Sequence, residues 1–242
     1  MGVLIRCNDS DFSNYVGVAM YPMTETLKNL YYMGTDAEKT AKDESGNGNN
    51  GTIVGTVSYQ DGYAEFSGTG TSNVMRAEDL PQTAAGVAGV ALVKISGNRA
   101  VFSNGTSVNS GCLIMSPNRF VFGTDTSEAL ADIRYALPSG DGFYVLAWVL
   151  TTTGYGVYVM QNGSVVKLAS GSVSGNAIKL YTGATANYKK LHIGGSSYNF
   201  AMDGTADIAA AGFYVGTPTE SEIKDAMGYL KIYGEHVGLT VN

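Results

Sequence analysis

The sequence has few cysteines, prolines and tryptophans: two, five and one among 242 residues. Cys7 and Cys112 lie far apart and outside any zinc-binding spacing, so they either pair or remain two buried thiols. This composition excludes a disulfide-built secreted domain. A chain of this length can bury a substantial core without disulfides.

Charge is also scarce: charged residues make up 15% of the chain, with 15 basic and 21 acidic side chains and a net charge of -6. Nucleic-acid binding needs clustered Lys and Arg side chains that neutralise phosphates, and the basic residues here are scattered. No apolar run has the length of a membrane span, and the N-terminus lacks the pattern of a signal peptide. We therefore expect no nucleic-acid partner and no membrane span.

Glycine and tyrosine are plentiful, at 32 and 16 residues. Many short strands joined by tight turns have this composition. Four Asn-Gly pairs mark turns, since both residues tolerate positive φ angles, and Asn162-Gly163 between two alternating runs predicts the clearest hairpin. The strand candidates are residues 30–33, 52–58, 63–67, 87–95, 100–103, 111–116, 119–123, 143–152, 157–161, 165–168, 190–194 and 206–215.

Three segments stand out from this strand pattern. The run 143–152 is apolar on both faces, which predicts a central strand covered on both sides. Residues 218–233 have helical spacing after Thr217 and Glu220, which form the pattern of a capping box. The charged segment 36–44 lacks a hydrophobic face and is expected to be a loop, as is 124–133.

The chain divides into two parts by composition. Residues 1–29 combine a polar turn with an apolar patch broken by Pro22, and we interpret them as an N-terminal arm or attachment segment. Residues 30–242 are expected to form one sandwich that ends in the helix at 218–233. An exposed apolar patch of this kind favours contact with a partner.

Four features occur in an order that resembles the laminin G-like domains of the concanavalin A-like lectin and glucanase superfamily. They are the Asn- and Gly-rich turn at 43–51 with its hairpin, the strand with Trp148, the hairpin at 156–166, and the strand at 190–194 followed by 206–215 and a helix. The resemblance implies an all-β fold: an antiparallel jelly-roll β-sandwich of the concanavalin A-like type with one short C-terminal helix. Such domains serve mostly for adhesion.

The sequence lacks the common motifs of catalysis. Glycosidases of the superfamily use paired carboxylates, but no expected central strand has two, and Glu128 and Asp132 fall in the expected loop. The chain has no Gly-x-Ser-x-Gly elbow, P-loop or dinucleotide fingerprint. His192 is more typical of a packed strand residue than of a base. We expect a protein that is not an enzyme and needs no cofactor.

Asp43, Ser45 and Asn47 repeat the first half of a calcium-binding loop, in which oxygens at alternate positions surround the cation. The twelfth position is Val54 instead of a bidentate glutamate, so half of the ligands are missing. The alternative is an Asx-rich turn whose side chains bond the local backbone. We favour the turn and predict no metal here.

Four tyrosines fall in or beside loops rich in Gly, Ser, Thr and Asn: Tyr155, Tyr181, Tyr188 and Tyr198. Aromatic rings beside amide and hydroxyl groups are suited to stacking on sugars. The same rings also suit the edge of a sandwich or contact with another subunit. Trp148 lies mid-strand between apolar residues and is expected to be buried.

Together with the unusual N-terminal segment and the lack of a signal peptide, the resemblance favours a non-enzymatic phage virion-surface protein, such as a tail fibre, that adheres to host carbohydrate. The alternative is a purely structural virion protein that decorates the capsid or joins tail components without a ligand. The expected partners are other virion proteins through residues 1–29, a host glycan and further copies of the chain. The expected location is the virion surface.

Overall fold

The computed structural model describes residues 21–68, 72–104, 113–180, 190–196 and 204–242. In chain order the elements are β1 (Leu27–Tyr32), α1 (Ala37–Ala41), β2 (Thr52–Val54), β3 (Ser58–Gln60), β4 (Tyr63–Phe66), β5 (Val74–Asp79), β6 (Thr83–Ala84), β7 (Gly86–Ser96), β8 (Phe102–Asn104), β9 (Leu113–Ser116), β10 (Arg119–Thr124), β11 (Ser127–Arg134), β12 (Tyr144–Thr151), β13 (Gly154–Gln161), β14 (Ser164–Ser172), β15 (Ile178–Lys179), β16 (Lys190–Ile193), β17 (Thr205–Val215) and α2 (Glu220–His236).

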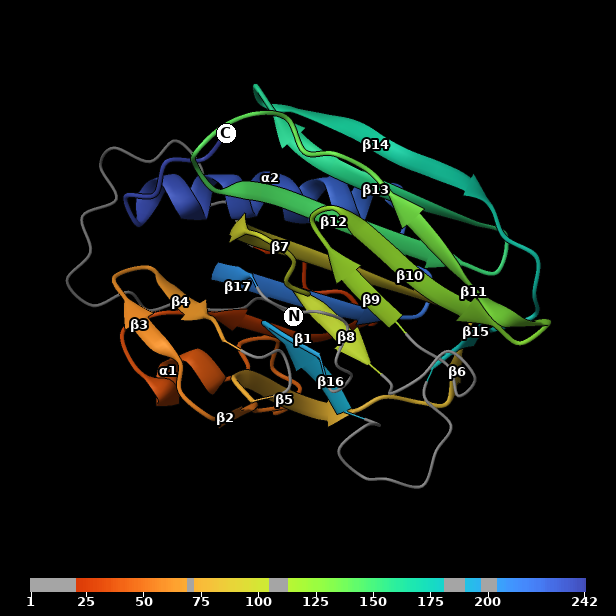
Figure 1. Cartoon of the computed structure of the whole chain (residues 1–242), viewed down its shortest axis with the longest axis horizontal. Helices are drawn as coiled ribbons and strands as arrows, with labels where there is room; N and C mark the ends of the chain where they lie inside the picture. Colours follow the sequence, from red (N-terminus) through yellow and green to blue (C-terminus); the bar gives the residue numbers. More distant parts are fainter. Residues whose placement is uncertain (1–20, 69–71, 105–112, 181–189, 197–203) are drawn as a thin grey trace, which may run out of the picture.

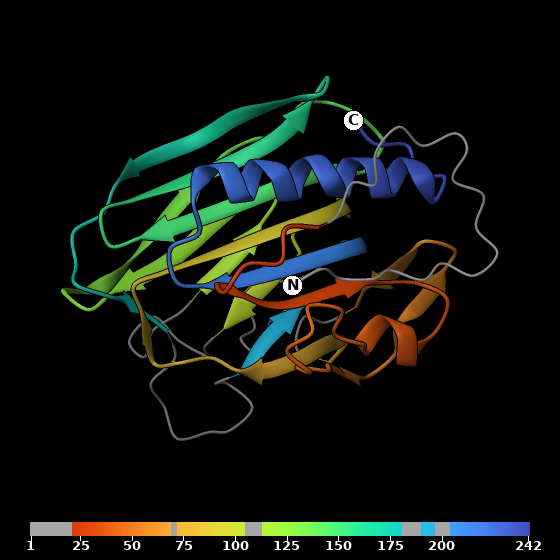
Figure 2. The same cartoon turned by 180° about the vertical axis from the view of Figure 1, so that it is seen from behind.

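The strands form two antiparallel sheets stacked face to face, and α2 lies across the outside of one of them (Figures 1 and 2). The first sheet has the order β14-β13-β12-β7-β17-β4-β3, with β1 also paired to β17. The second has the order β2-β5-β16-β8-β9-β10-β15-β6, with β11 paired to β10. The predicted antiparallel jelly-roll sandwich with one C-terminal helix is confirmed.

The main core lies between the sheets and contains the only tryptophan of the chain. Trp148 is completely buried, as predicted, and its ring meets the ring of Phe102 edge-on at 6.2 Å between centroids. The indole Nε1 donates to the hydroxyl of Tyr135 at 2.5 Å. The indole N–H can therefore be buried at little cost, because it has a hydrogen-bond partner.

A second apolar layer fills the space between the first sheet and α2. The helix contributes side chains at the spacing of one helical face, and β7 and β12 contribute the residues that alternate with those of the main core. This layer includes Ile223, Ala226, Met227 and Leu230 of α2 with Ala88, Val90, Leu92, Val145 and Ala147 of the sheet. The prediction that 143–152 is covered on both faces is confirmed by this layer.

Strand β1 shows where the sandwich begins. It starts at Leu27, three residues before the expected start of the sandwich at residue 30, and pairs with β17. Tyr21 is also buried, and its hydroxyl accepts a hydrogen bond from that of Tyr214 at 2.8 Å. A Cβ on Gly212 would lie 2.2 Å from the Tyr21 hydroxyl, so this glycine provides room for the ring. Residues 1–20 of the arm, and Cys7 and Cys112, lie outside the described residues.

Two segments expected to be loops are regular structure. In the segment 36–44, Asp36 caps the short helix α1 by accepting from the backbone N–H of Lys39 at 2.8 Å. This cap stabilises a helix that has no hydrophobic face. The segment 124–133 mostly belongs to β11, whose residues Ala131 and Ile133 pack against the core. Strand β5 was not predicted either.

The turns follow local chemistry more closely. Asn162 and Gly163 have φ angles of 50° and 75°, as a type I′ turn requires, and they join β13 to β14 as predicted. The capping box of α2 is formed by Thr219 and Glu222, not by Thr217 and Glu220. The sequence contains the Thr-x-x-Glu pattern twice, so the local pattern was unable to choose between them. No helix in the described parts of the chain is long and apolar enough to cross a membrane.

Candidate functional site

A groove on the outer face of the first sheet lies where the N-terminus of α2 meets the β12–β13–β14 hairpins. It encloses about 240 Å³. Its apolar lining includes Val149, Val165 and Ile223, and its polar lining includes Thr151, Glu220 and Lys224. An apolar surface with a few convergent polar groups is the usual form of a small-molecule site.

Tyr158 supplies the aromatic surface of this groove. Its ring lies over Gly156 on the same face of β13: a Cβ on Gly156 would come within 2.5 Å of the Tyr158 hydroxyl. On the neighbouring strand, Lys167 pairs with Tyr158, and its ammonium lies 5.5 Å from the centre of the ring. Glycine at 156 therefore allows the ring to lie along the sheet, where it is half-buried.

The rim of the groove carries an ion pair on the first turns of α2. The ammonium of Lys224 lies 2.9 Å from the carboxylate of Glu220, and both side chains are at least half exposed. The hydrogen bond between them raises the pKa of Lys224 and lowers the pKa of Glu220. Both groups are thus charged at neutral pH and can donate to and accept from a ligand.

The predicted sugar-contacting residue Tyr155 lines the groove but is not a loop residue. It is the second residue of β13, and its half-buried ring turns toward the space between the sheets. There the ring lies 5.5 Å from Phe122 and 6.4 Å from Phe120 between centroids, over Gly171. The ring therefore packs partly on the opposite sheet, and its contact with a sugar stays a prediction.

The other predicted sugar contacts, Tyr181, Tyr188 and Tyr198, lie outside the described residues. Sequence reasoning missed Tyr158 because it falls inside a predicted strand. The available signal was the pair Gly156 and Tyr158, two residues apart and therefore on one face of the strand. A glycine beside an aromatic residue on an otherwise apolar strand indicates a ring that lies flat.

The Asn- and Gly-rich turn has the hydrogen bonds expected of an Asx-rich turn. One carboxylate oxygen of Asp43 accepts from the backbone N–H groups of Leu30 at 3.0 Å and Ser45 at 2.9 Å. The other accepts from the N–H of Asn49 at 2.9 Å and from the Ser45 hydroxyl at 2.8 Å. The amide of Asn47 donates to the carbonyl of Leu27 at 2.8 Å. The turn is thereby attached to β1.

We predict that calcium does not stabilise the protein through this turn. Both oxygens of Asp43 already accept hydrogen bonds, and Val54 stands at the twelfth position of the loop pattern. The melting temperature in millimolar calcium is expected to equal that in chelator. A rise of several degrees that is lost in the Asp43→Asn variant would contradict this prediction.

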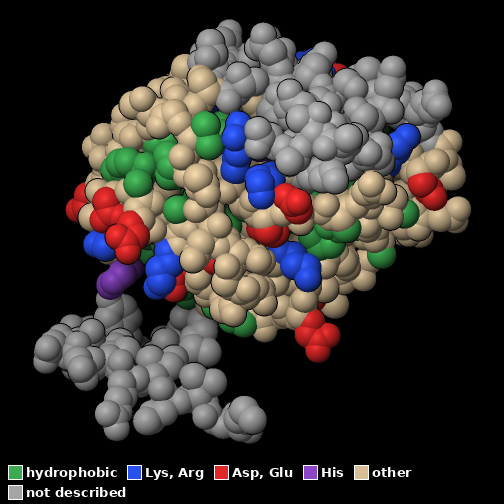
Figure 3. Space-filling view, turned by 90° about the horizontal axis from the view of Figure 1, so that it is seen from below, with side chains coloured by type: hydrophobic (Ala, Val, Ile, Leu, Met, Phe, Trp, Pro, Cys, Tyr) green, Lys and Arg blue, Asp and Glu red, His purple; other side chains and the backbone are tan. Residues whose placement is uncertain are grey.

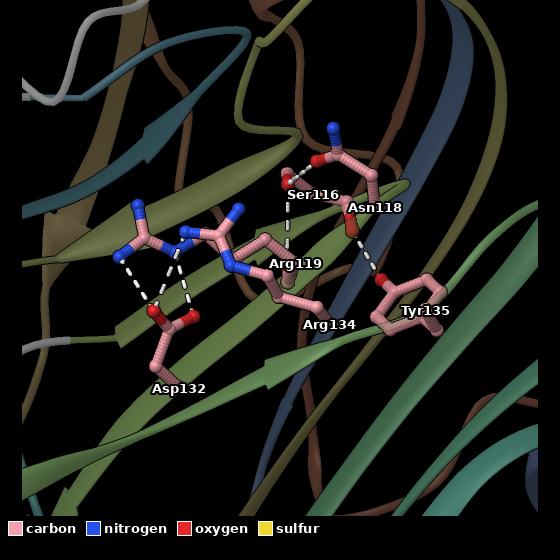
Figure 4. Close-up of polar contacts among 6 residues, drawn as sticks. All are labelled: Ser116, Asn118, Arg119, Asp132, Arg134 and Tyr135. Carbon is pink, nitrogen blue, oxygen red and sulfur yellow. Dashed lines mark hydrogen bonds and ion pairs between the residues drawn. The ribbon is translucent and has the colours of Figure 1, made fainter.

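Asp132, considered above as a possible member of a carboxylate pair, is held by arginines on the outer face of the second sheet (Figure 4). Arg119 reaches its two oxygens at 2.8 and 3.1 Å, and Arg134 lies 3.5 Å away. The hydrogen bond from Arg119 holds the pKa of Asp132 below its usual range. The carboxylate therefore pairs β11 with β10 and is poorly suited to donate a proton. The side chain of Glu128 lies outside the described part of the structure.

The chain has the fold of several solved binding domains. Over 84% of its length it superimposes on 98% of domain 4 of AbnA, a GH43 extracellular arabinanase from Geobacillus stearothermophilus, solved in complex with arabinotriose, with a TM-score of 0.60 and 18% identity. It matches the binding domain of Paraclostridial Mosquitocidal Protein 1 with a TM-score of 0.57 and 14% identity, over 86% of this chain. For the binding domain of botulinum neurotoxin DC, solved with SialylT, these values are 0.57, 11% and 85%.

The chain spans almost all of the arabinanase domain but only about half of the toxin binding domains, at 52% and 51%. No protein-family model and no curated protein sequence matches it. At these identities the likeness shows the fold alone. The superposition on these domains agrees with the predicted fold.

Proposed function

We propose that this chain is a non-enzymatic carbohydrate-binding domain and that the groove between α2 and the β12–β14 hairpins holds the sugar. The observation that carries the proposal is the ring of Tyr158, placed flat over Gly156 in a groove rimmed by Lys224, Glu220 and Thr151. Sugars have apolar C–H faces bordered by hydroxyl groups, so they match a ring bordered by donors and acceptors. The fold shared with an arabinanase domain solved with arabinotriose supports this ligand class.

Lys167 does not prevent a sugar from reaching Tyr158. Its ammonium lies 5.5 Å from the ring centre, and the pair stands at the solvent-facing side of an edge hairpin. An exposed cation–π contact contributes only about 0.5–1 kcal/mol. A sugar face that covers the ring and bonds to the rim replaces this contact at little cost, while the ammonium is free to turn toward a sugar hydroxyl.

We predict that Tyr158→Ala weakens glycan binding by about tenfold or more, the equivalent of 1.4 kcal/mol. Tyr158→Phe keeps the stacking surface and is expected to retain most of the affinity. Calorimetric titration with arabinotriose, followed by a glycan array for the multivalent protein, measures both. Equal affinity of Tyr158→Ala and the wild type would remove this groove as the sugar site.

The loop tyrosines Tyr181 and Tyr188 remain proposed additional contacts, as does Tyr198. The double variant Tyr181→Ala, Tyr188→Ala tests them in the same assays. An unchanged affinity would limit the site to the groove at Tyr158. If no glycan binds the wild type at high multivalent display, the carbohydrate proposal fails as a whole.

We further propose that the domain belongs to a phage virion surface, such as a tail fibre, and adheres to host carbohydrate. The support is the sequence: the resemblance to laminin G-like domains and the compositionally distinct residues 1–29. The alternative is a structural virion protein that decorates a capsid or joins tail parts. Binding of a glycan by the isolated chain favours the first, and incorporation into particles without glycan binding favours the second.

The N-terminal arm is the proposed attachment to other virion proteins or to further copies of the chain. Deleting residues 1–20 is expected to leave a folded sandwich, because β1 begins at Leu27 and Tyr21 remains to pack beneath α2. The truncated chain is expected to lose its assembly partner and to run at monomer mass in size-exclusion chromatography. A truncated chain that fails to fold would show that the arm is part of the core.

A further inference from the structure

A second groove lies on the other side of the sandwich, at the outer face of the second sheet. It runs between the Asx-rich turn and β5, and its lining includes Asn49, Asn50, Thr52, Arg76, Glu78 and Lys190. Figure 3 shows the side of the molecule on which β2 and β5 lie in Figure 1, and Lys and Arg side chains stand beside Asp and Glu side chains across its middle. This groove is lined mainly by polar residues, in contrast to the groove at Tyr158.

Two charged groups in this groove have unused hydrogen-bonding atoms. Along β5, Met75 contacts the main core, so its neighbour Arg76 points outward, beside Thr52 of β2. Glu78 lies beyond an irregularity in the pairing of β5 with β16 and also lines the groove. The Nε of Arg76 and one carboxylate oxygen of Glu78 are both buried, and neither has a hydrogen-bond partner within the described residues. One is a donor and the other is an acceptor.

The surroundings hold Glu78 and two other residues that line the groove in place before any ligand arrives. The second oxygen of Glu78 accepts from the amide of Asn29, a completely buried residue of β1, at 2.5 Å. Lys190 is paired with Asp79 at 3.0 Å, and the amide of Asn49 donates to the carbonyl of Lys28 at 2.7 Å. Such preorganisation lowers the entropy that a ligand loses on binding.

The unused atoms also define the ligand. A buried polar atom without a partner costs about 1–3 kcal/mol, so a ligand that pairs with both atoms recovers this free energy. One guanidinium and one carboxylate balance in charge, which favours a neutral ligand. Hydroxyl groups both donate and accept, so two neighbouring hydroxyls satisfy an arginine and a glutamate together.

We infer that this groove is a second carbohydrate site, which takes two adjacent hydroxyl groups of a neutral sugar. Arg76 donates to one hydroxyl, and Glu78 accepts from its neighbour. The inference rests on the proposed function and extends it, since the two grooves lie on opposite faces of the sandwich. A single chain would then hold two glycan chains at once.

Side-chain NMR signals of the full chain test the inference directly, because the Nε–H of an arginine is visible in nitrogen–proton spectra. The ¹⁵N-labelled protein is titrated at pH 7.5 with arabinotriose and maltotriose, both neutral, and with sialyllactose, which is acidic. Burial raises the pKa of Glu78, and a pH above neutrality favours its ionised form for this reason. A neutral sugar is expected to shift the signals of Arg76 and of the side-chain amide of Asn49 in a saturable manner.

Variants separate the two grooves. Arg76→Gln and Glu78→Gln are each expected to weaken this binding by about tenfold, the worth of one charged hydrogen bond. Arg119→Gln is the matched control on the same sheet, since Arg119 is already paired with Asp132, and it is expected to change nothing. In the Tyr158→Ala variant, the shift at Arg76 is expected to persist.

Other outcomes overturn the inference. Shifts near Gly156 that persist in the Arg76→Gln variant, with none at Arg76 in the wild type, would leave the proposed function standing and remove the second site. A response at Arg76 to sialyllactose alone would show an anion site instead of a diol site. No response at Arg76 to any of the three sugars would reject a sugar site in this groove.

Discussion

Replacing Arg99 with alanine is expected to lower the free energy of unfolding by about 4 kcal/mol, one of the largest effects of a single substitution in this protein. Arg99 is completely buried and is not part of an ion pair among the described residues. Its guanidinium donates to three backbone carbonyls: Gly194 at 2.7 Å, Gly68 at 2.6 Å and Asn73 at 2.7 Å. It therefore joins the ends of β4, β5 and β16 from a position far away in sequence.

The size of this effect follows from what remains after the substitution. Three carbonyl oxygens lose their donor, and the hydrogen bond to Gly194 is fully buried. Each hydrogen bond to a charged group is worth about 1.5–3 kcal/mol. Arg99→Lys keeps the charge but is expected to recover only part of the loss, because an ammonium lacks the planar fork that reaches all three oxygens. Urea unfolding monitored by the fluorescence of the buried Trp148 measures both variants.

Arg134→Ala is the control for Arg99. The Arg134 side chain is 69% exposed and lies 3.5 Å from Asp132, so its removal is expected to change the stability by less than about 1 kcal/mol. An Arg99→Ala variant as stable as Arg134→Ala would show that the three carbonyls find other partners, and the proposed role of Arg99 would be wrong.

Acid is expected to destabilise the protein through His192 by about 2 kcal/mol between pH 7 and pH 4.5. Burial, followed by the charge of Arg76, lowers the pKa of His192 from 6.5 to about 4. The unfolded chain therefore binds a proton near pH 6.5, whereas the folded chain resists it until about pH 4. Stability is complete above the unfolded pKa and falls as the pH drops through this window.

Other groups also titrate in this range, so the prediction is tested by comparing the free energy of unfolding of the wild type with that of a variant. His192→Asn removes the titration, and the stability difference between the wild type and this variant is expected to move by about 2 kcal/mol in favour of the variant on going from pH 7 to pH 4.5. A constant difference between wild type and His192→Asn across this range would contradict the low pKa.

The sequence by itself determined the fold class, the central strand at 143–152 and the C-terminal helix. These features depend on patterns between near neighbours: the run of apolar residues around Trp148, the positive φ angles available to Asn162 and Gly163, and the helical spacing from Ile223 to Leu230. Patterns of this kind involve residues that are close in the sequence, so they can be recognised without a structure.

The tertiary structure decided the other features, because each of them depends on contacts between residues that are far apart in the sequence. β11 has charged outward positions and became a strand through pairing with β10, where Arg119 compensates Asp132. The position of Tyr155 beside a loop does not reveal that its ring packs on Phe122 of the opposite sheet. The second groove requires Asn29 to meet Glu78 across 49 residues. Spacing along the chain carries no information on such meetings, since they depend on the order in which strands assemble into sheets.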